Sequence, residues 1–150
     1  MAGRKNPCRG VVDTSVLVAG IVGFKPFATL GHNPSAKLLR DWIENRIFVW
    51  LVTEDILNEY KEVLGRLGVR RNVIGALVNQ LREEAEFVEI RSPRSLSPDP
   101  ADDPFCACAE SGQAAFIVTL NPKDFPQKDL SARVILPGEP IPTTARRAKR

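Results

Sequence analysis

The stretch that most constrains the fold is an apolar run near the N-terminus, Arg9–Gly20, which one acid and two hydroxyl residues interrupt. Within it, Val11–Val18 is predicted to be a buried strand whose end carries one carboxylate, Asp13. In an open parallel α/β sheet, ligands bind outside the carboxyl ends of the strands, so Asp13 stands where chemistry is expected. The alternative is that Asp13 caps a turn through Thr14 and Ser15. This stretch alone leaves both interpretations open.

Beyond this stretch, apolar runs alternate with helical stripes, and this alternation predicts an α/β fold with a parallel sheet. Continuous apolar runs predict further strands at 47–52, 87–90, 115–119 and 134–136. Helices are expected after Asn33 and Thr53, which are residue types that cap helix N-termini, and over 73–85. A last helix is expected to have Asp103 as its N-cap and Pro104 at its first position.

Length and charge limit the class of protein. At 150 residues the chain is expected to form a single domain over 1–140, followed by a basic, flexible tail at 141–150. The formal net charge is +3, and removing the four basic residues of the tail leaves −1, so a broad basic surface is not expected. No apolar run approaches the roughly 20 residues of a membrane span, which excludes insertion into a bilayer.

The cysteines indicate a reducing compartment. Cys8, Cys106 and Cys108 are odd in number and lack the paired spacing of a metal knuckle. No signal-peptide pattern precedes them, so we expect a cytoplasmic protein with free thiols. Cys106 and Cys108 would face different directions on a helix, and we interpret them as core residues rather than joint metal ligands.

Glu59 is the acid of the helix after Thr53 that is placed like a site residue. The apolar stripe of this helix centres near Tyr60 and continues to Leu67. Glu59 lies about 40° beyond the edge of the stripe, on the rim of the buried side, whereas the other acids of the helix point toward solvent. As a bare pattern, a boundary glutamate is also typical of an ordinary helix surface.

Further acids and an amide come next to other predicted strand ends and helix starts. Asp102 and Asp103 precede the last helix, and Asn121 and Asp124 follow the strand at 115–119. Grouped carboxylates favour Mg²⁺ or Mn²⁺, and two such ions roughly 3.5–4 Å apart can activate water for phosphodiester cleavage. The sequence shows no serine, cysteine and histidine relay and no glycine-rich phosphate loop that would indicate another chemistry.

Four stretches in this order resemble the PIN-domain family, in particular the VapC-like toxins of prokaryotic toxin–antitoxin modules. They are Val11–Leu17, Thr53–Tyr60, Asp99–Phe105 and Ala115–Phe125. The resemblance covers about Arg9 to Pro137 and implies a three-layer α/β/α sandwich with a central, mainly parallel sheet. It also implies a Mg²⁺- or Mn²⁺-dependent ribonuclease that cleaves RNA, forms a homodimer and is silenced by a small antitoxin protein.

The resemblance assigns the central roles to three acids. Asp13, Glu59 and Asp102 are expected to bind metal and to carry catalysis. Asp102 is preferred to Asp103 because Asp103 is better explained as the helix cap, and because the family acid usually precedes the helix aromatic by three positions, as Asp102 precedes Phe105.

The resemblance places a fourth acid after Thr119. Asp124 is the predicted catalytic and metal-binding residue there, and it competes with Asn121, which would be a departure that weakens the second metal. Thr14, Ser15 and Thr119 are expected to supply hydroxyls that orient the carboxylates.

Binding of RNA is expected to rest on few basic residues. Arg70 and Arg71 lie in the folded part, and Arg146 and Arg147 lie in the tail. Two other classes of protein compete with the nuclease. One is a PIN-like module without nuclease activity that binds RNA or a protein, and the other is an acid-pocket α/β protein such as a phosphotransfer receiver or a haloacid-type phosphatase.

Overall fold

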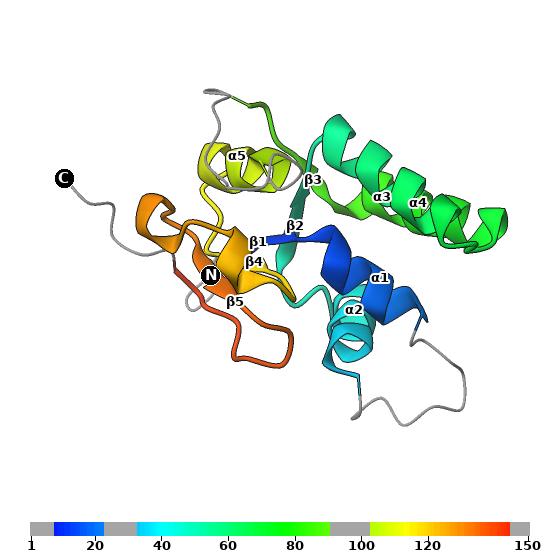
Figure 1. Ribbon diagram of the computed structural model, residues 1–150, viewed down its shortest axis with the longest axis horizontal. Helices are drawn as coiled ribbons and strands as arrows, with labels where there is room; N and C mark the ends of the chain where they lie inside the picture. The colour runs from blue at the N-terminus through cyan, green and yellow to red at the C-terminus, as the bar shows by residue number, and fades with distance from the viewer. Residues whose placement is uncertain (1–7, 23–32, 91–102, 145–150) are drawn as a thin grey trace, which may run out of the picture.

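A five-stranded parallel sheet forms the centre of the computed structural model, which describes residues 8–22, 33–90 and 103–144 (Figure 1). The strands lie in the order β3-β2-β1-β4-β5, and each neighbouring pair is parallel. Their bounds are β1 Arg9–Val12, β2 Val49–Val52, β3 Glu86–Phe87, β4 Phe116–Val118 and β5 Arg133–Ile135. The parallel sheet agrees with the prediction from the alternating apolar patterns.

Helices connect the strands. Their bounds are α1 Thr14–Val22, α2 Pro34–Asn45, α3 Glu54–Arg66, α4 Arg71–Glu84 and α5 Asp103–Ser111, with short 3₁₀ turns η3 Pro122–Asp124 and η4 Gln127–Asp129. The predicted caps are confirmed, because the side chain of Asn33 accepts from the amide of Ala36 and that of Thr53 accepts from the amide of Ile56. None of these described helices combines the length and hydropathy of a membrane span.

Neighbouring residues of β2 show that helices cover both faces of the sheet. Trp50 contacts Trp42 of α2 and Tyr60 of α3 through its ring. Leu51 points to the other face, because side chains alternate along a strand, and there it lies against Gly112 at the end of α5. In Figure 1, α2 and α5 accordingly lie on opposite sides of the sheet, which confirms the predicted three-layer α/β/α sandwich.

The strand order reverses at β1. From β1 the chain moves to β2 and then to β3 on one side, and it returns to β4 and β5 on the other. In open α/β sheets, ligands bind in the crevice outside the carboxyl ends of the strands at such a switch point. The residues that follow β1 and β4 therefore occupy the position at which a site is expected.

The prediction that Val11–Val18 forms one strand is wrong in its second half. The strand ends at Val12, and the carbonyl of Asp13 accepts the amides of Val16 (3.0 Å) and Leu17 (3.4 Å), which begins α1. Val16 and Leu17 are fully buried. A short buried helix and a buried strand give the same continuous apolar run, so hydrophobicity alone could not separate them.

Three smaller predictions also need correction. Strand β3 is Glu86–Phe87 and does not extend to residue 90. Leu67 is 57% exposed and not part of the core, because α3 ends one residue before it. Helix α5 begins at Asp103, one residue earlier than predicted, so Asp103 belongs to the first turn and not to the cap.

The prediction that Cys106 and Cys108 are core residues is confirmed. All three cysteines are free, and Cys106 and Cys108 are buried in the core. Burial raises the pKa of Cys108 to about 12, so this thiol is neutral at physiological pH. It is therefore a packing residue and not a nucleophile.

Candidate functional site

Asp13 joins the ends of the two central strands. It directly follows β1, and its amide donates to the carbonyl of Val118, the last residue of β4, over 2.9 Å. The residue is only 4% exposed. The carboxylate is thus held at the switch point of the sheet, as predicted from its place at the end of the first strand.

Two hydroxyls fix the orientation of this carboxylate. Ser15 Oγ and Thr119 Oγ1 donate to Asp13 Oδ2 over 2.6 and 2.7 Å. The same hydroxyl oxygens accept backbone amides, Ser15 from Leu120 (3.1 Å) and Thr119 from Asn121 (3.0 Å). Because these amides occupy the acceptor side of each hydroxyl, the hydroxyl proton is left to point at Asp13. The orienting role predicted for Ser15 and Thr119 is compatible with this geometry.

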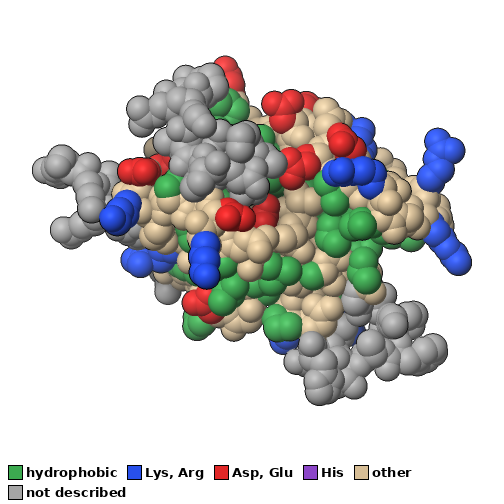
Figure 2. All heavy atoms as spheres, viewed as in Figure 1, with side chains coloured by type: hydrophobic (Ala, Val, Ile, Leu, Met, Phe, Trp, Pro, Cys, Tyr) green, Lys and Arg blue, Asp and Glu red, His purple; other side chains and the backbone are tan. Residues whose placement is uncertain are grey.

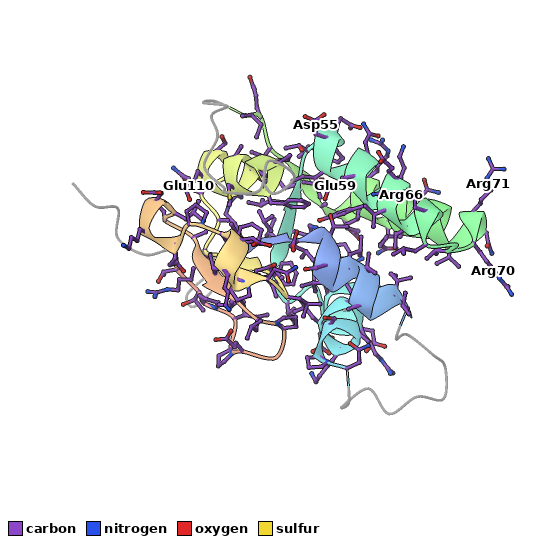
Figure 3. The ribbon with its side chains drawn as sticks, in the orientation of Figure 1. Asp55, Glu59, Arg66, Arg70, Arg71 and Glu110 are labelled. Atoms are coloured by element: carbon purple, nitrogen blue, oxygen red, sulfur yellow. The ribbon has the colours of Figure 1, made fainter. Side chains whose placement is uncertain are left out.

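Glu59 reaches the same region from α3. The hydroxyl of Thr14, the first residue of α1, donates to Glu59 Oε2 over 2.5 Å. Thr14 is buried and Glu59 is half-buried. Since Thr14 is the chain neighbour of Asp13, this contact brings the rim acid of α3 beside the first acid, and Figure 3 shows Glu59 on the part of α3 next to the start of α1.

Tyr60 holds the end of β1 in place, directly before Asp13. The sequence did not reveal this role. Its hydroxyl donates to the carbonyl of Val12 over 2.6 Å and accepts from Trp50 Nε1 over 3.3 Å. Burial raises the pKa of Tyr60 well above its ordinary value, and the nearby acids Asp13 and Glu59 raise it further. The neutral phenol thereby stays a donor to the residue that precedes Asp13. One feature of the sequence could have indicated this role. A tyrosine at the centre of an apolar stripe is expected to be buried, and its buried hydroxyl then needs a hydrogen-bond partner.

The negative charge of Asp13 has no positive partner among the described side chains, so the site is suited to a bound cation. Its hydrogen-bond donors are neutral hydroxyls, and among the described residues no lysine or arginine forms a salt bridge with it. A buried carboxylate without a positive partner is costly, and carboxylate and hydroxyl oxygens are the donors that hard divalent ions prefer. The residues present therefore fit Mg²⁺ or Mn²⁺.

The described residues do not by themselves complete a metal centre. Within the ranges that the structure describes, no group of three or more histidine, cysteine or acidic side chains is arranged to hold a metal ion. Asp102 and the side chain of Asp103 lie outside the description, so their predicted roles stay predictions. Asn121 is exposed just before η3, and Asp124 is half-buried at its end, which leaves the choice of the fourth residue open.

The predicted nucleic-acid contacts lie away from the acids. Arg70 and Arg71 stand at the turn between α3 and α4, at the free end of the hairpin that these helices form (Figure 3). Arg146 and Arg147 lie outside the described residues. The structure thus brings together Asp13, Glu59 and the three hydroxyls, and it places the two described arginines at a separate end of the molecule.

The chain matches a known protein family. A family model described as PIN domain matches residues 9–123, which contain β1, Asp13, Glu59 and β4. A search of curated proteins finds no match. The matched range covers most of the chain and ends one residue before Asp124.

Proposed function

The chain belongs to the PIN-domain family, whose members are generally nucleases, and on this premise we propose that it is a metal-dependent endoribonuclease. The observation that carries the proposal is the buried Asp13, whose carboxylate is oriented by two hydroxyls at the switch point of the sheet. Glu59 stands beside it through Thr14. Two oriented acids in this place suit phosphodiester hydrolysis better than they suit a passive binding surface.

Asp13 and Glu59 would hold the divalent ion, together with Asp102 and Asp124, as the resemblance to the family implies. When bound, the ion would supply Lewis acidity and a water molecule of lowered pKa. The protein's own contribution is orientation: Ser15 and Thr119 fix one oxygen of Asp13, and Thr14 fixes Glu59.

The finer parts of the proposal rest on the resemblance to VapC-like toxins. We propose that the chain cleaves RNA, that it is the toxin of a toxin–antitoxin pair, and that its partner is a protein antitoxin. A homodimer has some support in the fold, because Ile21, Ile43 and Val73 help to line an apolar hollow of about 240 Å³. Figure 2 shows hydrophobic side chains gathered over α1 and beside the hairpin. Light scattering of the purified chain tests the dimer.

Cleavage of a mixed RNA substrate tests the function directly. The wild type is incubated with Mg²⁺ or Mn²⁺ and with EDTA, beside Asp13→Asn and Glu59→Gln. Each variant is expected to lose more activity than the about 10- to 100-fold that loss of an outer-shell contact costs. The matched control is Glu62→Gln, which removes an exposed acid three positions further along α3 and is expected to cleave normally.

Metal binding gives an independent readout in the same proteins. Mn²⁺ is expected to raise the melting temperature of the wild type and not that of Asp13→Asn, since a ligand stabilises only the state that binds it. If the wild type cleaves no RNA with any metal and its melting temperature does not respond, the nuclease proposal is wrong. The alternative, a PIN-like binding module, would then be preferred.

A further inference from the structure

Three exposed arginines gather at the free end of the α3–α4 hairpin. Arg66 is on the last turn of α3, Arg70 precedes α4, and Arg71 is its first residue. In Figure 3, Arg70 and Arg71 project from the end of the hairpin to opposite sides, and Arg66 lies between that end and Glu59. Figure 2 shows basic side chains standing clear of the surface at this end of the molecule.

These arginines lack the close carboxylate partners that four of the other five described arginines have. Among the described residues, Arg9, Arg40, Arg46 and Arg82 each contact a carboxylate within 3.0 Å. Arg66 reaches Glu62 only at 3.9 Å, with both side chains mostly exposed. Arg70 and Arg71 have no acidic partner within 4.0 Å in the described part of the chain. The hairpin end therefore presents positive charge that the fold does not use.

Arg66 is aligned with the candidate site. It follows Glu59 by seven positions in α3, which is almost two full turns. The two side chains therefore lie about 20° apart around the helix axis and about 10 Å apart along it. The same face of α3 leads from the rim of the acidic site to the arginines of the hairpin end.

We propose that this face is a track for a single RNA strand, with its phosphates contacting Arg66 beyond the acidic site and Arg70 and Arg71 at the hairpin end. The proposal rests on the proposed nuclease function and names its substrate-holding surface. Guanidinium groups bind phosphate oxygens in a bidentate manner, and unpaired arginines need not first break an ion pair. At about 3.4 Å per stacked nucleotide, Arg66 would meet the strand about three nucleotides from the acids.

The backbone at the hairpin end is also open to close approach. A side chain added at Gly65 or Gly75 would meet nothing within 4 Å. Gly75 lies one turn after Arg71 on α4, so it is on nearly the same face of that helix. Neither glycine is required by packing within the described chain, whereas a strand lying over Arg71 would benefit from a bare backbone beside it.

The test measures binding without cleavage. Fluorescently labelled single-stranded RNAs of about 4 and about 12 nucleotides are titrated with Asp13→Asn protein, and with the wild type in EDTA in case that variant folds poorly. The combined change Arg66→Gln, Arg70→Gln and Arg71→Gln is expected to weaken binding of the longer RNA about tenfold or more. It should reduce the slope of log affinity against log salt by about 2, because each phosphate contact on a single strand contributes about 0.7.

A matched control separates the track from general charge. Lys37→Gln, Lys128→Gln and Arg133→Gln remove the same charge elsewhere on the surface and are expected to leave the longer RNA's affinity within about twofold. An equal loss in this control, or an unchanged salt slope in the hairpin variant, would overturn the track and favour a protein partner for the arginines. Because binding is measured without catalysis, failure of the wild type to cleave RNA counts only against the nuclease function.

Discussion

The polar and charged side chains at the two ends of α3 differ in whether they are paired within the protein. Beside its first half, around Asp13, the described polar groups are bonded to one another: two hydroxyls hold the carboxylate and a tyrosine holds the strand before it. At its far end, Arg70 and Arg71 have no close acidic partner among the described residues. The first region fixes one geometry, whereas the second offers charge to something outside the chain. A site that must orient a reactive group and a surface that must accept a flexible polymer have these opposite requirements.

Glycines show the same contrast in packing. In the sheet, a side chain added at Gly10 would come within 2.1 Å of the Phe116 ring. At the hairpin end, Gly65 and Gly75 have open space where a side chain would be. In the sheet, the absence of a side chain at Gly10 leaves room for the Phe116 ring. At the hairpin end, Gly65 and Gly75 leave the helix backbone uncovered.

The largest expected effect is therefore in the sheet. Gly10→Ala should destabilise the protein by about 3 kcal/mol, because the new methyl group overlaps the Phe116 ring at the centre of the core and the ring has to shift. Urea unfolding monitored by circular dichroism measures the loss. A loss under about 1 kcal/mol would mean that the ring moves aside at little cost, and the packing contrast with the hairpin would then be weaker than the distances indicate.

The second-largest effect is expected from removing the hydrogen bonds of the Tyr60 hydroxyl. Tyr60→Phe keeps the ring but leaves the Val12 carbonyl and Trp50 Nε1 without a buried partner, which should cost about 2 kcal/mol. It should also reduce the Mn²⁺-induced rise in melting temperature, since Val12 precedes Asp13. If stability falls but the metal response is unchanged, Tyr60 supports the fold only and does not position the site.

The pattern of the sequence predicted the local parts of this site, whereas its contacts between distant residues came from the family resemblance or from the structure. Asp13 was recognised from the strand before it, and Glu59 from its angle on an amphipathic helix. Contacts between distant residues were not predictable in this way. Thr119, 106 positions from Asp13, was expected to orient the carboxylate only from the resemblance to the PIN-domain family, and the bond from Tyr60 to Val12, 48 positions away, was not predicted. Such contacts depend on the order of strands in the sheet, which a single sequence specifies only indirectly.

The same reasoning explains the errors in the predicted secondary structure and core. Caps such as Thr53 were predicted because a cap is a contact within three residues. The helix at Val16–Val18 was taken for strand because its whole surface is apolar, so it carries no period that distinguishes it. Leu67 was assigned to the core because it continued a stripe, yet the helix ends just before it. Periodicity identifies faces well and ends poorly.

A smaller effect of opposite sign is expected at the hairpin end. Gly75→Ala should stabilise the free protein by about 0.5–1 kcal/mol, because alanine loses less conformational entropy in a helix and meets no neighbour here. Thermal unfolding measures the gain. If a strand approaches this backbone, the same change should weaken RNA binding while it raises stability. A stability loss instead would reveal a contact at Gly75 and remove the distinction between the two regions.

The smallest effect concerns the base of the hairpin, where Arg82 makes two hydrogen bonds to Glu54. This contact lowers the pKa of Glu54 below its ordinary value of 4.5. A carboxyl whose pKa is lower in the folded state adds stability above its unfolded pKa, and that stability is lost as the pH falls through the folded value. The contribution should therefore be complete at neutral pH and be lost as the pH falls from 4.5 through the lowered pKa of Glu54.

Arg82→Gln isolates this contribution. The variant should melt slightly below the wild type at neutral pH, and the gap should close in acid, while NMR titration should show the Glu54 pKa returning toward its ordinary value. Glu54→Gln should behave alike. Arg82 also lies over the Phe87 ring at 6.0 Å. A gap that persists in acid for Arg82→Gln but closes for Glu54→Gln would therefore assign the stabilisation to the ring contact, and the hairpin would be held at its base by packing instead of charge.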